Sequence, residues 1–270
     1  MELENRVAVV TGAARGLGRA VSKALAESHC RVMVVDVDES GAAETAMLVK
    51  DGGAEGIALS ADVTNAGDVV RMISAAEERF GGLDILVNNA GGTGEIGFPD
   101  SSAPDWERCL RLNLHAPMLT IQAALPAFAR RGGGSVVNVS SIAGVLNGPY
   151  LWPEYAAAKA GLLRLTEAVA APLLTKGVRV NAVAPNYILT EAVRTSFERM
   201  TQAEREAIPP PISTPEEVAG AILTLIRDDS NSGRALLWWF DEPHLAPENR
   251  VHAWLRPERR RSRLSRASPG

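Results

Sequence analysis

From Val7 to about Phe240, short runs rich in β-branched residues alternate with longer stretches of helical periodicity. Parallel strands that are buried on both faces appear as continuous apolar runs, and each pair needs a helical crossover between its strands. The alternation therefore predicts one parallel sheet with helices on both faces. We expect seven strands, over Val7 to Thr11, Arg31 to Asp36, Gly56 to Asp62, Asp84 to Ala90, Ser135 to Ser141, Val178 to Pro185 and Arg234 to Phe240.

The periodic stretches between these strands predict helices, and a length of 270 residues favours one large domain over two small ones. We assign residues 1–245 to a doubly wound α/β domain and residues 246–270 to a flexible tail, in which Arg, Ser and Pro dominate and apolar residues are too sparse for a core. The clearest helices are Leu17 to Ser28, Asp68 to Phe80, Pro104 to Arg131 with a kink at Pro117, Tyr155 to Thr175 and Pro215 to Arg227.

Charge and composition exclude several classes of protein. The net charge is -4, and residues 256–270 hold six Arg and one Glu, so the remainder is acidic and argues against nucleic acid as a partner. No stretch of about 18 apolar residues predicts a membrane span, and the acidic start predicts a cytoplasmic protein. Cys30 and Cys109 are the only cysteines and lack nearby histidine pairs, so we expect neither a disulfide nor a metal site.

A glycine-rich loop joins the first strand to the first helix, with Gly12, Gly16 and Gly18 in the spacing G-x-x-x-G-x-G. Without side chains the loop backbone can approach a pyrophosphate, and the helix N-terminus offers free N–H groups to it. Glycines at strand ends are also plain turn formers, so the loop alone does not decide between the two roles.

Asp36 ends the second strand, where a carboxylate can accept hydrogen bonds from ribose hydroxyls and would repel a 2′-phosphate. This predicts NAD as the cofactor, with NADP less favoured. Arg15 in the glycine loop is a cation that could partly offset the acid. The alternative is that Asp36 only starts the turn that follows the strand.

Further motifs, taken in order, resemble the short-chain dehydrogenase/reductase family over about residues 5–240. The resemblance implies a Rossmann-type fold and hydride transfer between nicotinamide and an alcohol or carbonyl carbon. It also implies cofactor contacts from the loop, including Leu17, and from residues of later strand ends. The motifs are Thr11 to Gly18, Asp62-Val63, Asn88-Asn89-Ala90-Gly91, Asn113, Ser140-Ser141, Tyr155 to Lys159 and Asn181 to Pro185.

Tyr155 and Lys159 are four residues apart, so both side chains lie on one helix face. An ammonium about 5 Å from the phenol would lower the tyrosine pKa by roughly 2 units, which would suit proton transfer near neutral pH. The resemblance assigns cofactor contacts to both residues as well. Their structural alternative is an amphipathic residue and a snorkelling cation on one helix.

Ser141, 14 residues before Tyr155, is the expected hydrogen-bond partner of the substrate oxygen, and Ser140 competes with it for that role. The resemblance favours Ser141. It also implies that the backbone of Asn113 holds a water that relays protons to Lys159; the alternative is a residue that kinks its helix.

Two departures from the family pattern limit what can be carried over. Asn186 follows Pro185 where the family usually has Gly; Asn tolerates left-handed angles, so Ile188 and Thr190 should still meet the carboxamide. The segment from Asp241 to Pro243 replaces the usual Val-Asp-Gly-Gly ending, which puts contacts made by that end in doubt.

Segments that follow strand ends on the nicotinamide side are expected to form the substrate pocket, and their aromatic residues predict an apolar substrate. They are Gly92 to Glu95, Leu146 to Trp152 and Tyr187 to Phe197, with Tyr150 among them, and Glu191 to Ala207 could form a lid. The long helices predict a homodimer or homotetramer, as in the resembling family. Two other functions stay open: a binding-only regulator on the same fold, and an epimerase or dehydratase that uses the same tyrosine.

Overall fold

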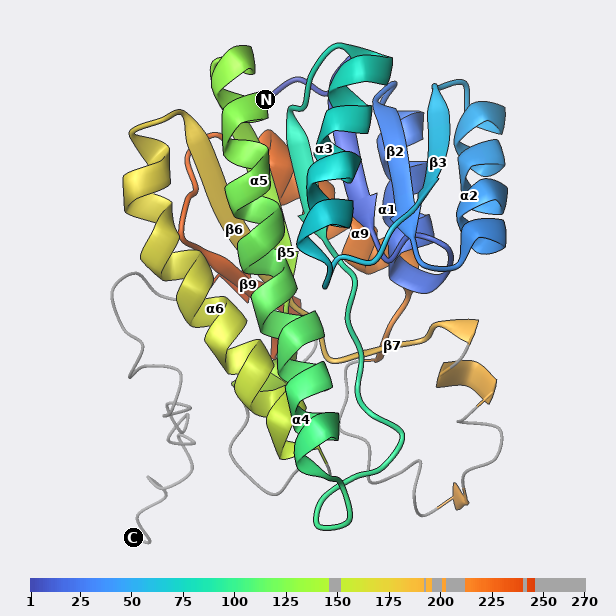
Figure 1. Cartoon of the computed structure of the whole chain (residues 1–270), viewed down its shortest axis with the longest axis vertical. Coiled ribbons are helices and arrows are strands. Elements are labelled where there is room, and N and C mark those ends of the chain that lie inside the picture. Colours follow the sequence, from blue (N-terminus) through green and yellow to red (C-terminus); the bar gives the residue numbers. More distant parts are fainter. Residues whose placement is uncertain (146–151, 192, 196–200, 203–211, 240–241, 246–270) are drawn as a thin grey trace, which may run out of the picture.

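The computed structural model describes residues 1–145, 152–191, 193–195, 201–202, 212–239 and 242–245, which form a twisted sheet between two layers of helices (Figure 1). All seven expected strands are present and parallel, in the order β9-β6-β5-β4-β1-β2-β3. The bounds are β1 Val7–Thr11, β2 Arg31–Asp36, β3 Gly56–Ser60, β4 Ile85–Asn88, β5 Gly134–Val139, β6 Val178–Ala184 and β9 Ala235–Trp239.

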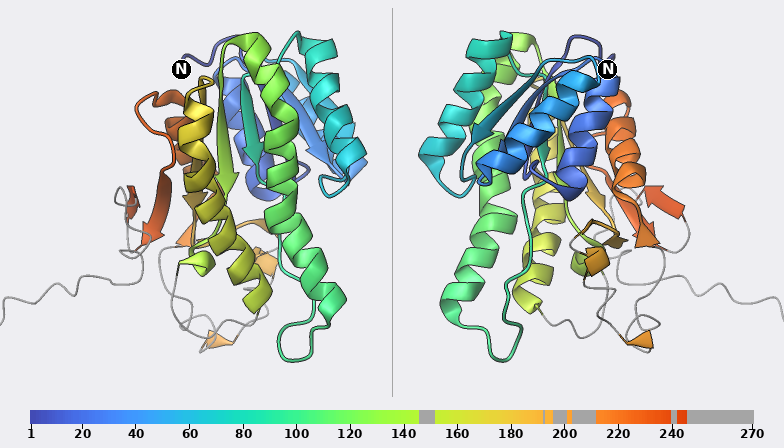
Figure 2. Two further views of the ribbon diagram at one scale, coloured as in Figure 1. Left: turned by 60° about the vertical axis from the view of Figure 1, so that its left-hand side comes forward. Right: turned by 90° about the vertical axis from the view of Figure 1, so that its right-hand side faces the viewer.

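Helices cover both faces of the sheet, which confirms the doubly wound α/β architecture (Figure 2). On one face lie α1 (Gly16–Glu27), α2 (Glu39–Asp51) and α9 (Pro215–Arg227). On the other lie α3 (Ala66–Phe80), α4 (Ala103–Leu110), α5 (Ala116–Arg131) and α6 (Pro153–Leu174). None of the helices in the described ranges is long and apolar enough to span a membrane.

The structure adds four elements that the sequence reading lacked. Strand β10 (Glu242–Leu245) pairs antiparallel with β9 at the sheet edge, and β7 (Tyr187–Ile188) pairs with β8 (Ile212–Ser213) outside the main sheet. Helix α2 has Asp38 as its N-cap and buries Ala42, Ala46 and Val49, an i, i+4, i+7 spacing that could have revealed it. The tail 246–270 lies outside the described residues, so its flexibility stays a prediction.

The expected long helix from Pro104 to Arg131 is continuous but changes its winding in the middle. A π-helical turn, Arg111–His115, separates α4 from α5, and Pro117 lies in the first turn of α5. A π-turn accommodates one extra residue, and such turns occur frequently at functional sites. Asn113 lies within this turn.

Strand order determines where the site forms. The chain leaves β1 toward β2 on one side, whereas β4 returns to pair with β1 on the other. This reversal opens a crevice at the C-terminal ends of β1 and β4, because the crossovers on the two sides run in opposite directions. The loops after Thr11 and Asn88 both start at this crevice.

Candidate active site

The glycine loop is held against the turn that follows β4. Asn89 Nδ2 donates to the carbonyl oxygens of Thr11 and Gly12, each at 2.9 Å, and Thr11 Oγ1 accepts from the N–H groups of Asn89 and Ala90 at 3.1 Å. Gly12 has φ +62, and a Cβ there would lie 2.7 Å from Ala90 Cα. The first loop glycine is therefore required by conformation and by close packing.

The other two loop glycines serve different purposes. A Cβ on Gly18 would lie 2.2 Å from the Gly12 carbonyl oxygen and 2.6 Å from Asn89 Nδ2, so Gly18 lets α1 approach the loop. Gly16 has φ +56, and a Cβ there would lie 3.2 Å from the Thr190 methyl carbon. No side chain caps the N-terminus of α1, and no acidic residue lies in its first turn. The first N–H groups of α1 are thus left for an anionic ligand.

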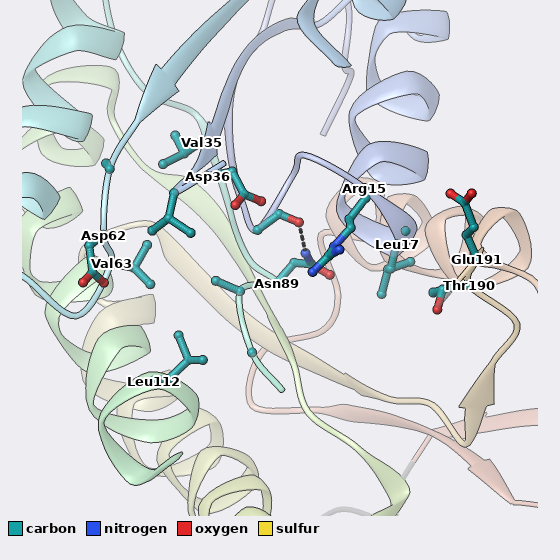
Figure 3. A pocket seen from close by; sticks show the side chains of 16 residues that line it. Arg15, Leu17, Val35, Asp36, Asp62, Val63, Asn89, Leu112, Thr190 and Glu191 are labelled. Atoms are coloured by element: carbon teal, nitrogen blue, oxygen red, sulfur yellow. Dashed lines mark hydrogen bonds between the residues drawn. The ribbon is translucent and has the colours of Figure 1, made fainter. Parts of the chain in front are cut away.

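A pocket of about 460 Å³ extends along this loop, with Asp62 and Val63 at one end and Thr190 and Glu191 at the other (Figure 3). Most of the expected cofactor contacts line it. They are Gly12, Arg15, Gly16, Leu17, Asp36, Asp62, Val63, Asn89, Ala90, Gly91 and Thr190. A glycine cradle, an uncapped helix N-terminus and a carboxylate at the end of β2 together fit a dinucleotide.

The pocket has five further lining residues that sequence reasoning did not assign to the cofactor, although it placed Glu191 in the substrate wall and the lid. Their apolar members resemble core residues in sequence, so periodicity cannot mark them as pocket residues. Glu191 carries charge but lies beyond the family motifs. The five are Val35, Val37, Ala61, Leu112 and Glu191.

Asp36 both shapes and lines the pocket. Its Oδ2 accepts from the Ala14 N–H at 2.9 Å and its Oδ1 from the Asp38 N–H at 3.1 Å. These bonds hold the carboxylate beside the loop, so Asp36 both forms the turn and lines the pocket. Arg15 is exposed and extends over the same pocket (Figure 3).

Asp62 and its neighbours form the far end of the pocket. Asp62 Oδ1 accepts from the Thr64 N–H at 2.8 Å and from the Thr64 hydroxyl at 2.7 Å. The turn after β3 is therefore held in place, and Val63 and Leu112 offer apolar surface there. Such a lining suits a flat aromatic ring such as a base.

The expected Ser, Tyr and Lys residues meet at the ends of β5 and α6. The side chains of Ser141 and Tyr155 are hydrogen-bonded to each other, whereas the Ser140 hydroxyl donates to the Lys159 carbonyl at 2.8 Å. Ser140 therefore ties β5 to α6, and Ser141 is the serine that faces the tyrosine. Lys159 Nζ lies 5.5 Å from the centre of the Tyr155 ring and donates to the Val139 carbonyl at 2.8 Å.

The pKa of Tyr155 differs from the sequence expectation. Burial raises it to about 12, and the hydrogen bond with Ser141 opposes that rise. Burial also lowers the pKa of Lys159 to about 8. Spacing predicted that the ammonium would lower the phenol pKa, but the cost of burying a phenolate is the largest contribution, and the pKa rises.

Asn113 is fully buried in the π-turn and is bonded to the loop that follows Gly91. Its Nδ2 donates to the Gly92 carbonyl at 2.8 Å and to the Cys109 carbonyl at 2.9 Å, and its Oδ1 accepts from the Gly92 N–H at 3.0 Å. A Cβ on Gly91 would lie 2.7 Å from Asn113 Oδ1 and 3.1 Å from Lys159 Nζ. Asn113 thus lies in a distorted helix turn, on the side of Gly91 that also faces Lys159 Nζ. The proton relay through its backbone stays a prediction.

The segment after β6 keeps its place without a left-handed residue. The Pro185 carbonyl accepts from the Ile142 N–H at 2.9 Å, and among the described residues only Asn5 and His29 are non-glycines with positive φ. Asn186 therefore does not adopt the left-handed conformation that the family's glycine suggested. Ile188, in β7, packs against the core beside the pocket.

Part of the expected substrate wall lies outside the described residues. The wall residues outside the described ranges are 146–151, which include Tyr150, and Phe197. Most of the expected lid also lies outside these ranges. Of the remaining wall residues, Trp152 is half-buried and Tyr187 is exposed.

Comparisons with known proteins agree with this geometry. The sequence model of the family described as short chain dehydrogenase matches residues 6–201. The chain is 39% identical to cis-4-hydroxycyclohexanecarboxylate dehydrogenase of Sinomonas cyclohexanicum, over 83% of this chain and 90% of that protein. It is 37% identical to 3-oxoacyl-[acyl-carrier-protein] reductase of Synechocystis sp., over 84% and 91%. A crystal structure from Burkholderia xenovorans, described as a short-chain dehydrogenase/reductase, superposes with a TM-score of 0.81 at 32% identity, covering 87% of this chain and 95% of that one.

Proposed function

Since the chain belongs to the short-chain dehydrogenase/reductase family, we propose that it is an NAD-dependent oxidoreductase that interconverts a secondary alcohol and a ketone. The observation that carries this proposal is the hydrogen bond between the side chains of Ser141 and Tyr155 beside Lys159, next to a pocket that fits a dinucleotide. Bound nicotinamide would supply the hydride acceptor or donor.

Each polar group of the site has a distinct task in this proposal. Tyr155 takes the proton of the alcohol, or returns it to the ketone. Ser141 donates a hydrogen bond to the substrate oxygen and stabilises the charge that develops on it. Lys159 favours the phenolate, and Asn113 holds the Gly92 backbone beside the lysine.

We propose NAD as the preferred cofactor because the Asp36 carboxylate faces the pocket at the end of β2. A ribose 2′-hydroxyl would donate to it, whereas a 2′-phosphate would be repelled. Arg15 is the one cation on this part of the pocket lining and would counteract that preference.

For the substrate we propose a small apolar secondary alcohol or ketone, with a ring as a favoured shape. Trp152 and Tyr187 of the expected wall support this, and one relative acts on a hydroxycyclohexane carboxylate. We further propose a cytoplasmic homodimer or homotetramer, which light scattering would test against a monomer.

The direct test is a panel of secondary alcohols with NAD, and of ketones with NADH, followed by nicotinamide absorbance. Turnover of cyclic members above linear ones is the expected result. Tight NAD binding without turnover on any member would favour the binding-only regulator. Isomerisation of an added substrate without net change in nicotinamide would favour the epimerase.

A further inference from the structure

Four buried polar side chains form a hydrogen-bonded row from α5 through β4 and β5 to α6, and we call it the Asn ladder. The Thr120 hydroxyl donates to Asn88 Oδ1 at 2.7 Å, and Asn88 Nδ2 donates to Asn138 Oδ1 at 2.9 Å. Asn138 Nδ2 donates to the Thr166 hydroxyl at 2.9 Å, and that hydroxyl donates to the Leu162 carbonyl at 2.9 Å. At most 3% of each ladder residue is exposed.

The ladder bonds all run in one direction. Asn88 and Asn138 each accept from their neighbour toward α5 and donate to their neighbour toward α6, so the dipoles polarise one another. Asn88 and Asn138 are also direct register partners of the β4 and β5 strands. Loss of one donor leaves a buried acceptor unsatisfied, which makes the whole row favour a single arrangement.

The helical ends of the ladder stand in the same relation to two site residues. Thr120 follows Asn113 by seven residues along one continuous helix, and Thr166 follows Lys159 by seven along α6. Seven residues are about two turns of an α-helix, so Lys159 and Thr166 lie on one face of α6. Asn113 lies in the π-turn, and Thr120 lies further along the same continuous helix. The ladder therefore connects the helix that carries Asn113 with the face of α6 that carries Lys159.

The strand members stand next to the remaining parts of the site. Asn88 directly precedes Asn89, which clamps the glycine loop. Asn138 directly precedes Val139, whose carbonyl accepts the hydrogen bond from Lys159. Strands β4 and β5 and the helices that carry Asn113 and Lys159 thus each contribute one ladder residue.

We propose that the Asn ladder is a positioning device, in which Asn138 and Thr166 act through Val139 and Lys159 to hold the ammonium in register with the cofactor loop. The inference rests on the proposed function. The observations that carry it are the positions of Asn138 directly before Val139 and of Thr166 two turns after Lys159.

The test compares Thr166→Val, which removes the hydroxyl at nearly constant volume, with Thr166→Ser, which keeps it. Thr166→Val should lower kcat by ~10-fold or more, since a misplacement of about 1 Å costs up to ~10² in rate. Its KM for NAD should stay within about twofold, and the alkaline limb of its pH-rate profile should shift. Thr166→Ser should restore both. Ile226→Val, a buried change in α9 on the opposite face, controls for lost stability.

A Thr166→Val variant that keeps wild-type kcat, or that loses no more than Ile226→Val, would overturn the positioning role. Absence of any NAD-linked turnover in the wild-type protein would count against the proposed function instead. Hydrogen exchange then decides on the ladder: residues 139–141 and 155–159 should exchange faster in Thr166→Val and not in Thr166→Ser. Equal exchange in the two variants would refute it.

Discussion

Lys159 Nζ lies 5.5 Å from the centre of the Tyr155 ring, one helical turn further along α6, and its hydrogen bond goes to Val139 and not to the phenol. Burial affects the two groups in opposite directions, raising the pKa of Tyr155 to about 12 and lowering that of Lys159 to about 8. Both shifts favour the neutral forms, because a charged form loses hydration in a dry site. The pKa values of both groups should therefore change when charge or water enters the pocket.

Replacement of Tyr155 by Phe should lower kcat by the ~10² to 10⁴ typical of a lost acid-base group. The change deletes one hydroxyl and keeps the ring, so the fold and NAD affinity should stay close to those of the wild type. Stopped-flow turnover and NAD titration by fluorescence would measure the two effects separately. Near-normal turnover would show that another group moves the proton.

Replacement of Lys159 by Met should remove a pH dependence of stability. The folded pKa of about 8 lies below the unfolded value of 10.5, so the unfolded state binds more protons between these limits. The wild-type free energy of unfolding should therefore rise from pH 8 to about 10.5 relative to Lys159→Met, by at most ~1.4 kcal/mol per pH unit. Urea unfolding at several pH values would measure this. A constant difference across that window would mean that the lysine is not buried as described.

Replacement of Asp36 by Ala should shift cofactor use from NAD toward NADP. A charge-assisted hydrogen bond contributes about 1.5 to 3 kcal/mol, so the wild-type kcat/KM should favour NAD by at least ~10-fold, and the variant should lose most of that ratio. Asp38→Ala removes an equal charge from the N-cap of α2 and should change the ratio far less. NADP preference in the wild type would show that Arg15, and not Asp36, controls the site.

Replacement of Gly18 by Ala should weaken NAD binding by ~10-fold or more, because the new Cβ would lie 2.2 Å from the Gly12 carbonyl oxygen and displace the loop. Gly220→Ala is the matched control: it lies in α9 with open space around it and should raise stability by about 0.5–1 kcal/mol. Calorimetric NAD titration and thermal unfolding of both variants would check the pair. Unchanged NAD affinity in Gly18→Ala would contradict the role assigned to the loop.

Much of the fold follows from local patterns. The seven parallel strands were predictable because each is a short apolar run between helical stretches. Connections between parallel strands are short and right-handed, so few other topologies are possible. The glycine loop was predictable for a similar reason, since a Cβ at the position of Gly12 or Gly18 would clash with backbone atoms. By contrast, the short edge strand β10 has no such pattern, since Pro243 lies inside it.

What the sequence by itself determined was the order of elements and the kinds of residues brought to the crevice; only the tertiary structure decided which of them meet. Spacing alone left Ser140 and Ser141 as competitors; neighbours on an extended backbone point to opposite sides, so Ser140 bonds to α6 and Ser141 faces Tyr155. The high phenol pKa likewise depends on burial by segments distant in the chain. Contacts of this kind form between residues far apart in sequence, and spacing along the chain does not encode them.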